Sequence, residues 1–131
     1  MDRGEKALEN HKNGYNCAQS VLCAFCDKTG LSEDELFRIS EALGGGMGGT
    51  QGVCGAVSAM VLLAGLKMSK GIEALPETNK IKSYALAGEM MKEFENMNQS
   101  IICKRIKEEN LRSCDGCILD AVKILEEKLG D

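Results

Sequence analysis

Residues 53–67 have no polar face, and this stretch constrains the fold more than any other part of the chain. Its apolar residues fall on every side of a helix: Val53, Ala56, Val57, Met60, Val61, Leu62, Leu63 and Ala64. A helix that is apolar all round is stable where other helices cover it. The stretch is too short and too rich in small residues to cross a membrane. It therefore predicts the centre of a helical bundle, without membrane insertion.

The rest of the chain is also helical in pattern, because no stretch shows the period of two that strands require. Helices are expected at residues 2–13, 16–29, 32–43, 53–67, 76–98, 101–108 and 115–129. Start signals support three of them: Asn16 as an N-cap, Ser32 with Glu35 as a capping box, and Pro76 at a first helical position. A chain of 131 residues can bury roughly two-thirds of its unfolded surface without covalent staples. We therefore predict one all-α domain over residues 1–131, with six to seven helices around the central helix 53–67.

The helix expected at residues 76–98 is amphipathic. Its predicted inward face carries Ile81, Tyr84, Ala85, Ala87, Gly88, Met91 and Phe94. If helix 53–67 were exposed in the isolated chain, a homodimer interface would be the alternative explanation.

A glycine-rich loop over residues 44–52 precedes the central helix. Cys54 opens that helix, where unpaired amides lower the pKa of a thiol and make it a better nucleophile or metal ligand. The alternative is a small buried residue where helices cross closely. The loop lacks the Gly-Lys-Ser/Thr of a nucleotide-binding loop, although it could hold an anion. The glycines expected to approach a ligand or cofactor are Gly45, Gly46, Gly48, Gly52 and Gly55.

Seven cysteines and a single histidine, His11, indicate sulfur chemistry. An odd cysteine count and a charged, non-apolar segment over residues 1–15 argue against a secreted disulfide scaffold, so we expect a reducing, cytoplasmic location. The net charge of −4 and the few aromatic residues give no platform for nucleic acid. Any protein-ligated metal site would consist almost entirely of thiolates.

Two cysteine pairs have Cys-x-x-Cys spacing. Cys23 and Cys26 are predicted to lie inside a helix, with Cys23 on its polar side, and the spacing there is interpreted as incidental. Cys114 and Cys117 begin the last helix, as in thiol oxidoreductases, but no βαβ pattern surrounds them. The two pairs together could form a four-thiolate zinc site. Cys103, which precedes Lys104 and Arg105, is either a stabilised thiolate or a small core residue.

Five segments in this order resemble a known family: residues 14–19, 44–48, 53–56, 100–103 and 117–125. The chain resembles the bacterial C-GCAxxG-C-C family of candidate redox-active proteins, which is remotely similar to part of split-Soret cytochrome c. The resemblance implies a small all-helical domain whose four characteristic cysteines are Cys17, Cys54, Cys103 and Cys117. Ala59 replaces the last glycine of the family pattern, and Cys114 is additional to it. No Cys-x-x-Cys-His is present, so covalent haem attachment is not supported.

The leading hypothesis is thiol-based redox chemistry, in which Cys17, Cys54, Cys103 and Cys117 converge near the glycine loop and Cys54 reacts with the help of a resolving cysteine. Its partner would be a small thiol or a redox protein. The second hypothesis is a binding module in which the same four thiolates hold zinc, copper or an iron–sulfur cluster. The third is a helical interaction protein with inert thiols.

Overall fold

The structure is a computed structural model, and it describes residues 1–130. These residues form seven α-helices: α1 (Arg3–Lys12), α2 (Cys17–Ala24), α3 (Glu33–Ser40), α4 (Gly55–Met68), α5 (Lys80–Asn98), α6 (Cys103–Glu108) and α7 (Cys114–Leu129). Three single-turn 3₁₀ helices accompany them: η1 (Cys26–Lys28), η2 (Glu41–Leu43) and η3 (Ile72–Ala74). Residues 1–130 contain no strand, and Val53 and Ile102 form an isolated bridge. The all-α prediction is confirmed.

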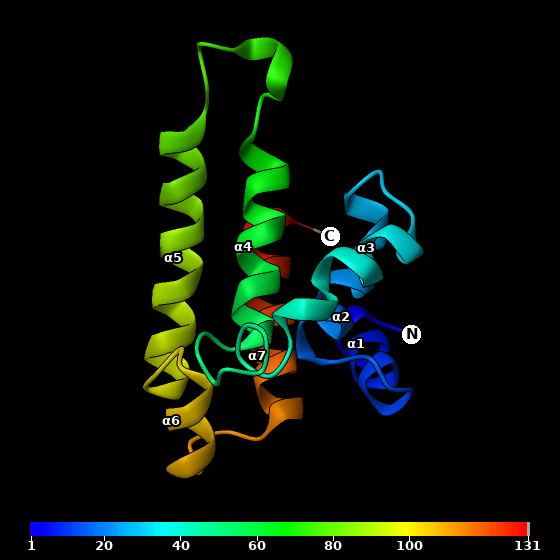
Figure 1. Ribbon diagram of the computed structural model, residues 1–131, viewed down its shortest axis with the longest axis vertical. Helices are drawn as coiled ribbons and strands as arrows, with labels where there is room; N and C mark the ends of the chain where they lie inside the picture. The colour runs from blue at the N-terminus through cyan, green and yellow to red at the C-terminus, as the bar shows by residue number, and fades with distance from the viewer. Residues whose placement is uncertain (131) are drawn as a thin grey trace.

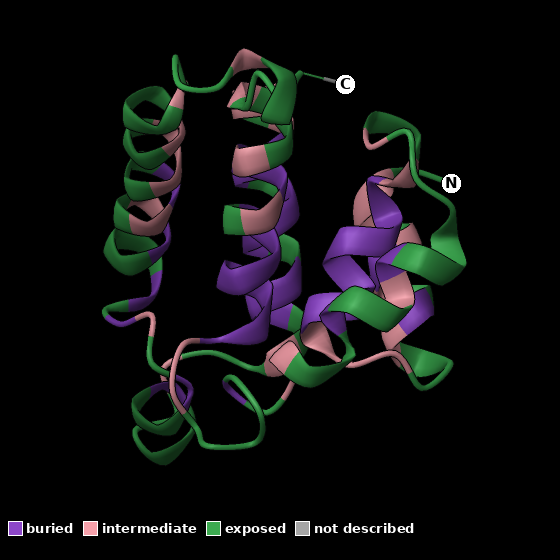
Figure 2. Cartoon of the chain, turned by 45° about the horizontal axis from the view of Figure 1, so that its top comes forward, coloured by how far each residue is buried: buried purple, intermediate pink, exposed green. Residues whose placement is uncertain are grey.

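Helix α4 lies in the middle of the arrangement (Figure 1). It contacts α5 on one side, α2 on the other, and α7 behind. Helices α1 and α3 pack on α2, and α1 also contacts α7. The first half of α4 is buried from Gly55 to Met60, as expected for the central helix of the bundle. Figure 2 shows this burial concentrated toward one end of α4.

The other end of the α4–α5 pair extends beyond the surrounding helices, and there the predicted burial is wrong (Figure 1). Val61 and Leu66 of α4 are exposed, as are Ile81 and Tyr84 of α5, at 72% and 66%. Ala85 and Gly88 are exposed as well. Phe94 is buried as predicted, and Ala87 and Met91 of the predicted face pack partly buried against the core. The buried residues of α5 are Met90, Phe94 and Asn98. These residues are spaced by four, so the buried stripe of the helix is rotated from the predicted one.

Helix starts follow the capping signals in the sequence. Asn16 and Gln19 form a reciprocal capping box at α2, as do Ser32 and Glu35 at α3. Two predicted boundaries are wrong. Helix α5 begins at Lys80, so Pro76 lies in the preceding connection, and α2 ends at Ala24. Within residues 1–130, no helix has both the length and the apolarity that crossing a membrane would require.

Candidate functional site

Five cysteines line one small cavity, which we call the thiol cavity. Its volume is about 40 Å³, enough for a few water-sized groups. Its walls are Cys17, Gly45, Gly46, Cys54, Gly55, Cys103, Ile106, Lys107, Arg112, Cys114 and Cys117. The structure thus brings together the four cysteines proposed from the sequence and adds Cys114. All of them carry free thiols.

The cavity lies where several helices begin. Cys17, Cys103 and Cys114 are the first residues of α2, α6 and α7, and Cys54 is the N-cap of α4. Cys117 lies one turn after Cys114 on α7, so the two share a helix face. Cysteines far apart in the sequence meet because the helices that they open converge at their N-terminal ends.

Backbone hydrogen bonds join the glycine loop to α6 and fix Cys103 beside Cys54. The Cys54 amide donates to the Ile101 carbonyl at 2.8 Å, and the Cys103 amide donates to the Gly52 carbonyl at 2.7 Å. Gly46 is required here. Its φ is +75°, and an added Cβ would lie 2.8 Å from the Cβ of Cys103. Only glycine fits this left-handed, crowded position.

Gly55 gives the same close approach between α2 and α4. A Cβ on Gly55 would lie 3.0 Å from the Ala18 amide nitrogen and 3.4 Å from the Cβ of Cys17. The two helix starts therefore pack almost backbone to backbone, and Cys17 lies next to Cys54. This close packing supports the expectation that glycines flanking Cys54 allow another chain segment to approach.

Cys54 and Cys117 both line the thiol cavity, and each affects the protonation of the other. The neighbouring Cys117 thiol, the Ala56 and Val57 amides, and the charge of Lys107 outweigh burial and lower the pKa of Cys54 to about 7. The proximity of Cys54, together with burial, raises the pKa of Cys117. The pair therefore holds a thiolate on Cys54 and a proton on Cys117 near neutral pH.

The sequence predicted that a helix start would lower the thiol pKa at Cys54 and in the Cys114–Cys117 pair. For Cys117 this prediction is wrong, because its pKa is raised. Cys54 is the N-cap residue of α4, and the second and third amides of that helix, those of Ala56 and Val57, help to lower the pKa of its thiol. Cys117 is the fourth residue of α7 and lies beyond the unpaired amides. In that helix the Gly116 amide is already satisfied by the Ser113 hydroxyl at 3.0 Å.

Cys17 and Cys103 are protonated near neutral pH. Burial raises the pKa of Cys17 to about 12, and the neighbouring Cys114 and Cys54 thiols add to this effect. Burial also raises the pKa of Cys103, although Lys107 opposes it. The cation beside Cys103 is therefore Lys107, one helical turn along α6, and not the predicted Arg105, which pairs with Glu109 at 3.1 Å.

An ion pair between the exposed Arg112 side chain and the buried Asp120 carboxylate lies beside the cavity. Arg112 donates to both carboxylate oxygens of Asp120, at 3.0 and 3.1 Å, and Asn98 donates to Asp120 at 3.1 Å. Asp120 is only 8% exposed. This network fixes the segment before α7 and holds the Arg112 guanidinium over Gly116 at the edge of the cavity.

A family model described as "Putative redox-active protein (C_GCAxxG_C_C)" matches residues 15–128. The chain belongs to this family. The resemblance of the five sequence segments is thereby confirmed. No curated protein and no solved structure matches the chain.

The C-GCAxxG-C-C pattern accounts for four of the five thiols in the cavity. Cys114, which lies outside that pattern, was not among the proposed site residues, nor were Lys107 and Arg112. Helical spacing offered a signal for two of them, because Cys114 lies three residues before Cys117 and Lys107 lies four residues after Cys103. Arg112 gave no comparable signal. Of the proposed glycines, Gly45, Gly46 and Gly55 line the cavity, whereas Gly48 and Gly52 shape the loop behind it.

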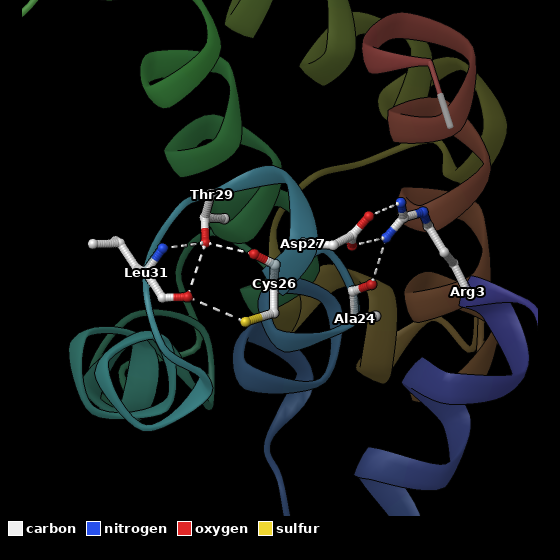
Figure 3. Close-up of polar contacts among 6 residues, drawn as sticks. All are labelled: Arg3, Ala24, Cys26, Asp27, Thr29 and Leu31. Atoms are coloured by element: carbon white, nitrogen blue, oxygen red, sulfur yellow. Dashed lines mark hydrogen bonds and ion pairs between the residues drawn. The ribbon is translucent and has the colours of Figure 1, made fainter.

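Cys23 and Cys26 lie outside the thiol cavity. Cys23 is 4% exposed, so its predicted place on a polar helix face is wrong. Helix α3 covers that face of α2, and the Cys23 thiol lies 3.9 Å from the Glu33 carbonyl oxygen. Cys26 is not inside α2 but begins η1, and its thiol donates to the Leu31 carbonyl at 3.2 Å (Figure 3).

The four-thiolate metal hypothesis requires several ligands at coordinating distance. Among residues 1–130, no group of three or more Cys, His, Asp or Glu side chains is placed so that it could hold a metal ion. His11, the one imidazole, lies with its Nδ1 2.8 Å from Asp115 and does not line the cavity.

Proposed function

We propose that the protein is a thiol–disulfide redox protein in which Cys54 is the nucleophile and Cys117 is the resolving cysteine. The observation that carries the proposal is that Cys54 and Cys117 line the same small cavity, where the Cys117 thiol lowers the pKa of Cys54. Thiol–disulfide exchange needs a thiolate to attack and a nearby second thiol to resolve the mixed disulfide. The Cys54–Cys117 pair has both properties.

The reaction would proceed in two balanced exchanges. The Cys54 thiolate attacks one sulfur of a disulfide small enough to reach it, forms a mixed disulfide and releases the other substrate sulfur as a thiolate, which takes a proton from water. Cys117 then gives up its proton, attacks the Cys54 sulfur and releases the second substrate sulfur, which takes up the Cys117 proton. The substrate gains two electrons and two protons, and the protein is left with a Cys54–Cys117 disulfide. A dithiol reductant restores it.

Hydrogen peroxide would use the same two residues. The Cys54 thiolate attacks one peroxide oxygen, which gives a sulfenic acid and hydroxide. The Cys117 thiol condenses with the sulfenic acid, which forms the disulfide and releases water. Because peroxide is little larger than water, it can enter a cavity of about 40 Å³.

Disulfide mapping by mass spectrometry after brief peroxide treatment of reduced protein tests this proposal. We expect a Cys54–Cys117 disulfide that a dithiol removes, and its complete loss in Cys54→Ser. Cys26→Ala, which changes a thiol outside the cavity, is the matched control and should form the disulfide normally. A purified protein with near-stoichiometric bound metal and thiols that resist alkylation until a chelator is added would contradict the proposal.

A further inference from the structure

The thiol cavity holds a second cysteine pair, which differs from the first in accessibility. Cys54 and Cys117 are both buried, whereas Cys17 and Cys114 are half-buried. The Cys114 thiol lies close enough to Cys17, and the Cys117 thiol close enough to Cys54, to shift the pKa of its neighbour. An outer and an inner pair therefore line the same small space.

The two pairs are linked through the helices that carry them. Cys114 and Cys117 lie one turn apart on α7, on the same face. Cys17 and Cys54 are adjacent because α2 and α4 meet at Gly55, where the Cβ of Cys17 lies within 3.4 Å of the position of an added Cβ. Cys114 thus has Cys117 as its neighbour along α7, and Cys17 has Cys54 as its neighbour where α2 meets α4.

We infer that Cys17 and Cys114 form an outer redox pair that passes a disulfide to Cys54 and Cys117, so that disulfides too large for the cavity can still oxidise the inner pair. This inference rests on the proposed function of the inner pair. The outer co-reactant is a disulfide of a small-molecule thiol or of a protein. Lys107 and Arg112 line the same cavity, so an anionic disulfide fits this position.

The transfer is balanced in atoms and electrons. An external disulfide oxidises the outer pair by two exchanges, which releases two external thiols and leaves a Cys17–Cys114 disulfide. The Cys54 thiolate then attacks the Cys17 sulfur, and Cys114 leaves as a thiolate that takes up a proton. Cys117 loses its proton, attacks the Cys54 sulfur and releases Cys17 as a thiolate that is protonated in turn. The disulfide moves inward without net oxidation of the chain.

The test compares a large and a small oxidant on reduced full-length protein. Glutathione disulfide carries several carboxylates and is far larger than the cavity, whereas hydrogen peroxide can enter it. In Cys114→Ala and Cys17→Ala, formation of the Cys54–Cys117 disulfide by glutathione disulfide should slow by at least about tenfold. Its formation by peroxide should stay within about twofold of the wild-type rate. Cys26→Ala should behave as wild type with both oxidants.

A trapping variant isolates the outer pair. In Cys54→Ala, glutathione disulfide should produce a Cys17–Cys114 disulfide that accumulates, because its acceptor is gone. The inference is overturned if this disulfide does not form, or if Cys114→Ala and Cys17→Ala are oxidised by glutathione disulfide at the wild-type rate. The two variants change different helices, so a folding defect in one, detected by circular dichroism, leaves the other to decide. Failure of the proposed function looks different: neither oxidant then produces a Cys54–Cys117 disulfide in the wild type.

Discussion

Cys23 and Cys26 are separated by the same two residues as Cys114 and Cys117, yet the two pairs lie in different parts of their helices. Cys23 is near the end of α2, and Cys26 opens the short η1 turn that follows. Cys114 and Cys117 occupy the first two turns of α7, beside the starts of α2 and α4. The thiols of Cys23 and Cys26 contact the start of α3 and the loop before it, whereas Cys114 and Cys117 line the thiol cavity.

The comparison shows that Cys-x-x-Cys spacing indicates a reactive thiol only where neighbouring groups stabilise the thiolate. Both pairs place two sulfurs on a single stretch of chain. Only the second pair lines a cavity with other cysteines, beside the first amides of α4 and Lys107. Sulfur reactivity depends on these neighbours because they decide whether the thiolate is stabilised.

The largest expected effect is a contrast in alkylation between Cys54 and Cys23. Both side chains are buried to a similar degree, at 6% and 4% exposed, so exposure does not separate them. Hydrogen bonding lowers the pKa of Cys54 to about 7, whereas burial and Glu33 raise the pKa of Cys23 to about 12. The greater thiolate fraction outweighs the lower intrinsic nucleophilicity, and at pH 8 we expect Cys54 to react about 30- to 90-fold faster.

Time-resolved mass-spectrometric mapping with iodoacetamide on reduced protein gives both rates. The rate at Cys54 should rise with a midpoint near pH 7, and Cys23 should show no midpoint below pH 10. Cys26→Ala should leave both profiles unchanged. Equal rates at Cys23 and Cys54 would show that the difference in their surroundings has no chemical consequence.

A smaller effect is expected from removing the resolving thiol. Cys117→Ala deletes the hydrogen bond that contributes most to the low pKa of Cys54. A hydrogen bond to a charged group is worth about 1.5–3 kcal/mol, so the midpoint for alkylation of Cys54 should rise by about one pH unit or more. Cys117→Ser keeps a donor and should shift it less.

The matched change in the other pair is Cys23→Ala, which should leave the Cys54 midpoint where it is. The pH dependence of alkylation, followed for each variant under the same conditions, measures these shifts. An unchanged midpoint in Cys117→Ala would assign the low pKa to the α4 amides and Lys107 alone.

Local patterns allowed the helices to be predicted, because caps and apolar runs act over a few residues. The capping boxes at Asn16 and Ser32 and the apolar start of α4 are examples. The rotated core stripe of α5 could not be predicted from its own sequence. Its exposed residues Ile81 and Tyr84 are as apolar as its buried ones. Which residues are covered depends on how far the neighbouring helices extend along α5.

The site was predictable to the extent that it depends on helix starts and on the family pattern. The contribution of the α4 amides to the low pKa of Cys54 follows from its position before that helix, whereas the larger contribution of Cys117 does not. The pairing of Cys117 with Cys54, and of Cys114 with Cys17, depends on how α2, α4 and α7 converge, which no local pattern encodes. The buried position of Cys23 was missed for the same reason, since α3 covers a helix face that looks polar in the sequence.

The smallest expected effect concerns Cys26, whose thiol has a structural partner. It donates to the Leu31 carbonyl at 3.2 Å, and that carbonyl also lies 3.5 Å from the Thr29 hydroxyl (Figure 3). Because the contact is exposed to solvent, Cys26→Ala should lower the free energy of unfolding by only about 0.5 kcal/mol. Cys26→Ser should recover most of this loss, because its hydroxyl can donate to the same carbonyl. Urea unfolding of the reduced protein measures both changes, and the yield of the Cys54–Cys117 disulfide should be the same in both variants. A loss above about 2 kcal/mol, or a lower disulfide yield, would mean that the Cys23–Cys26 region supports the thiol cavity after all.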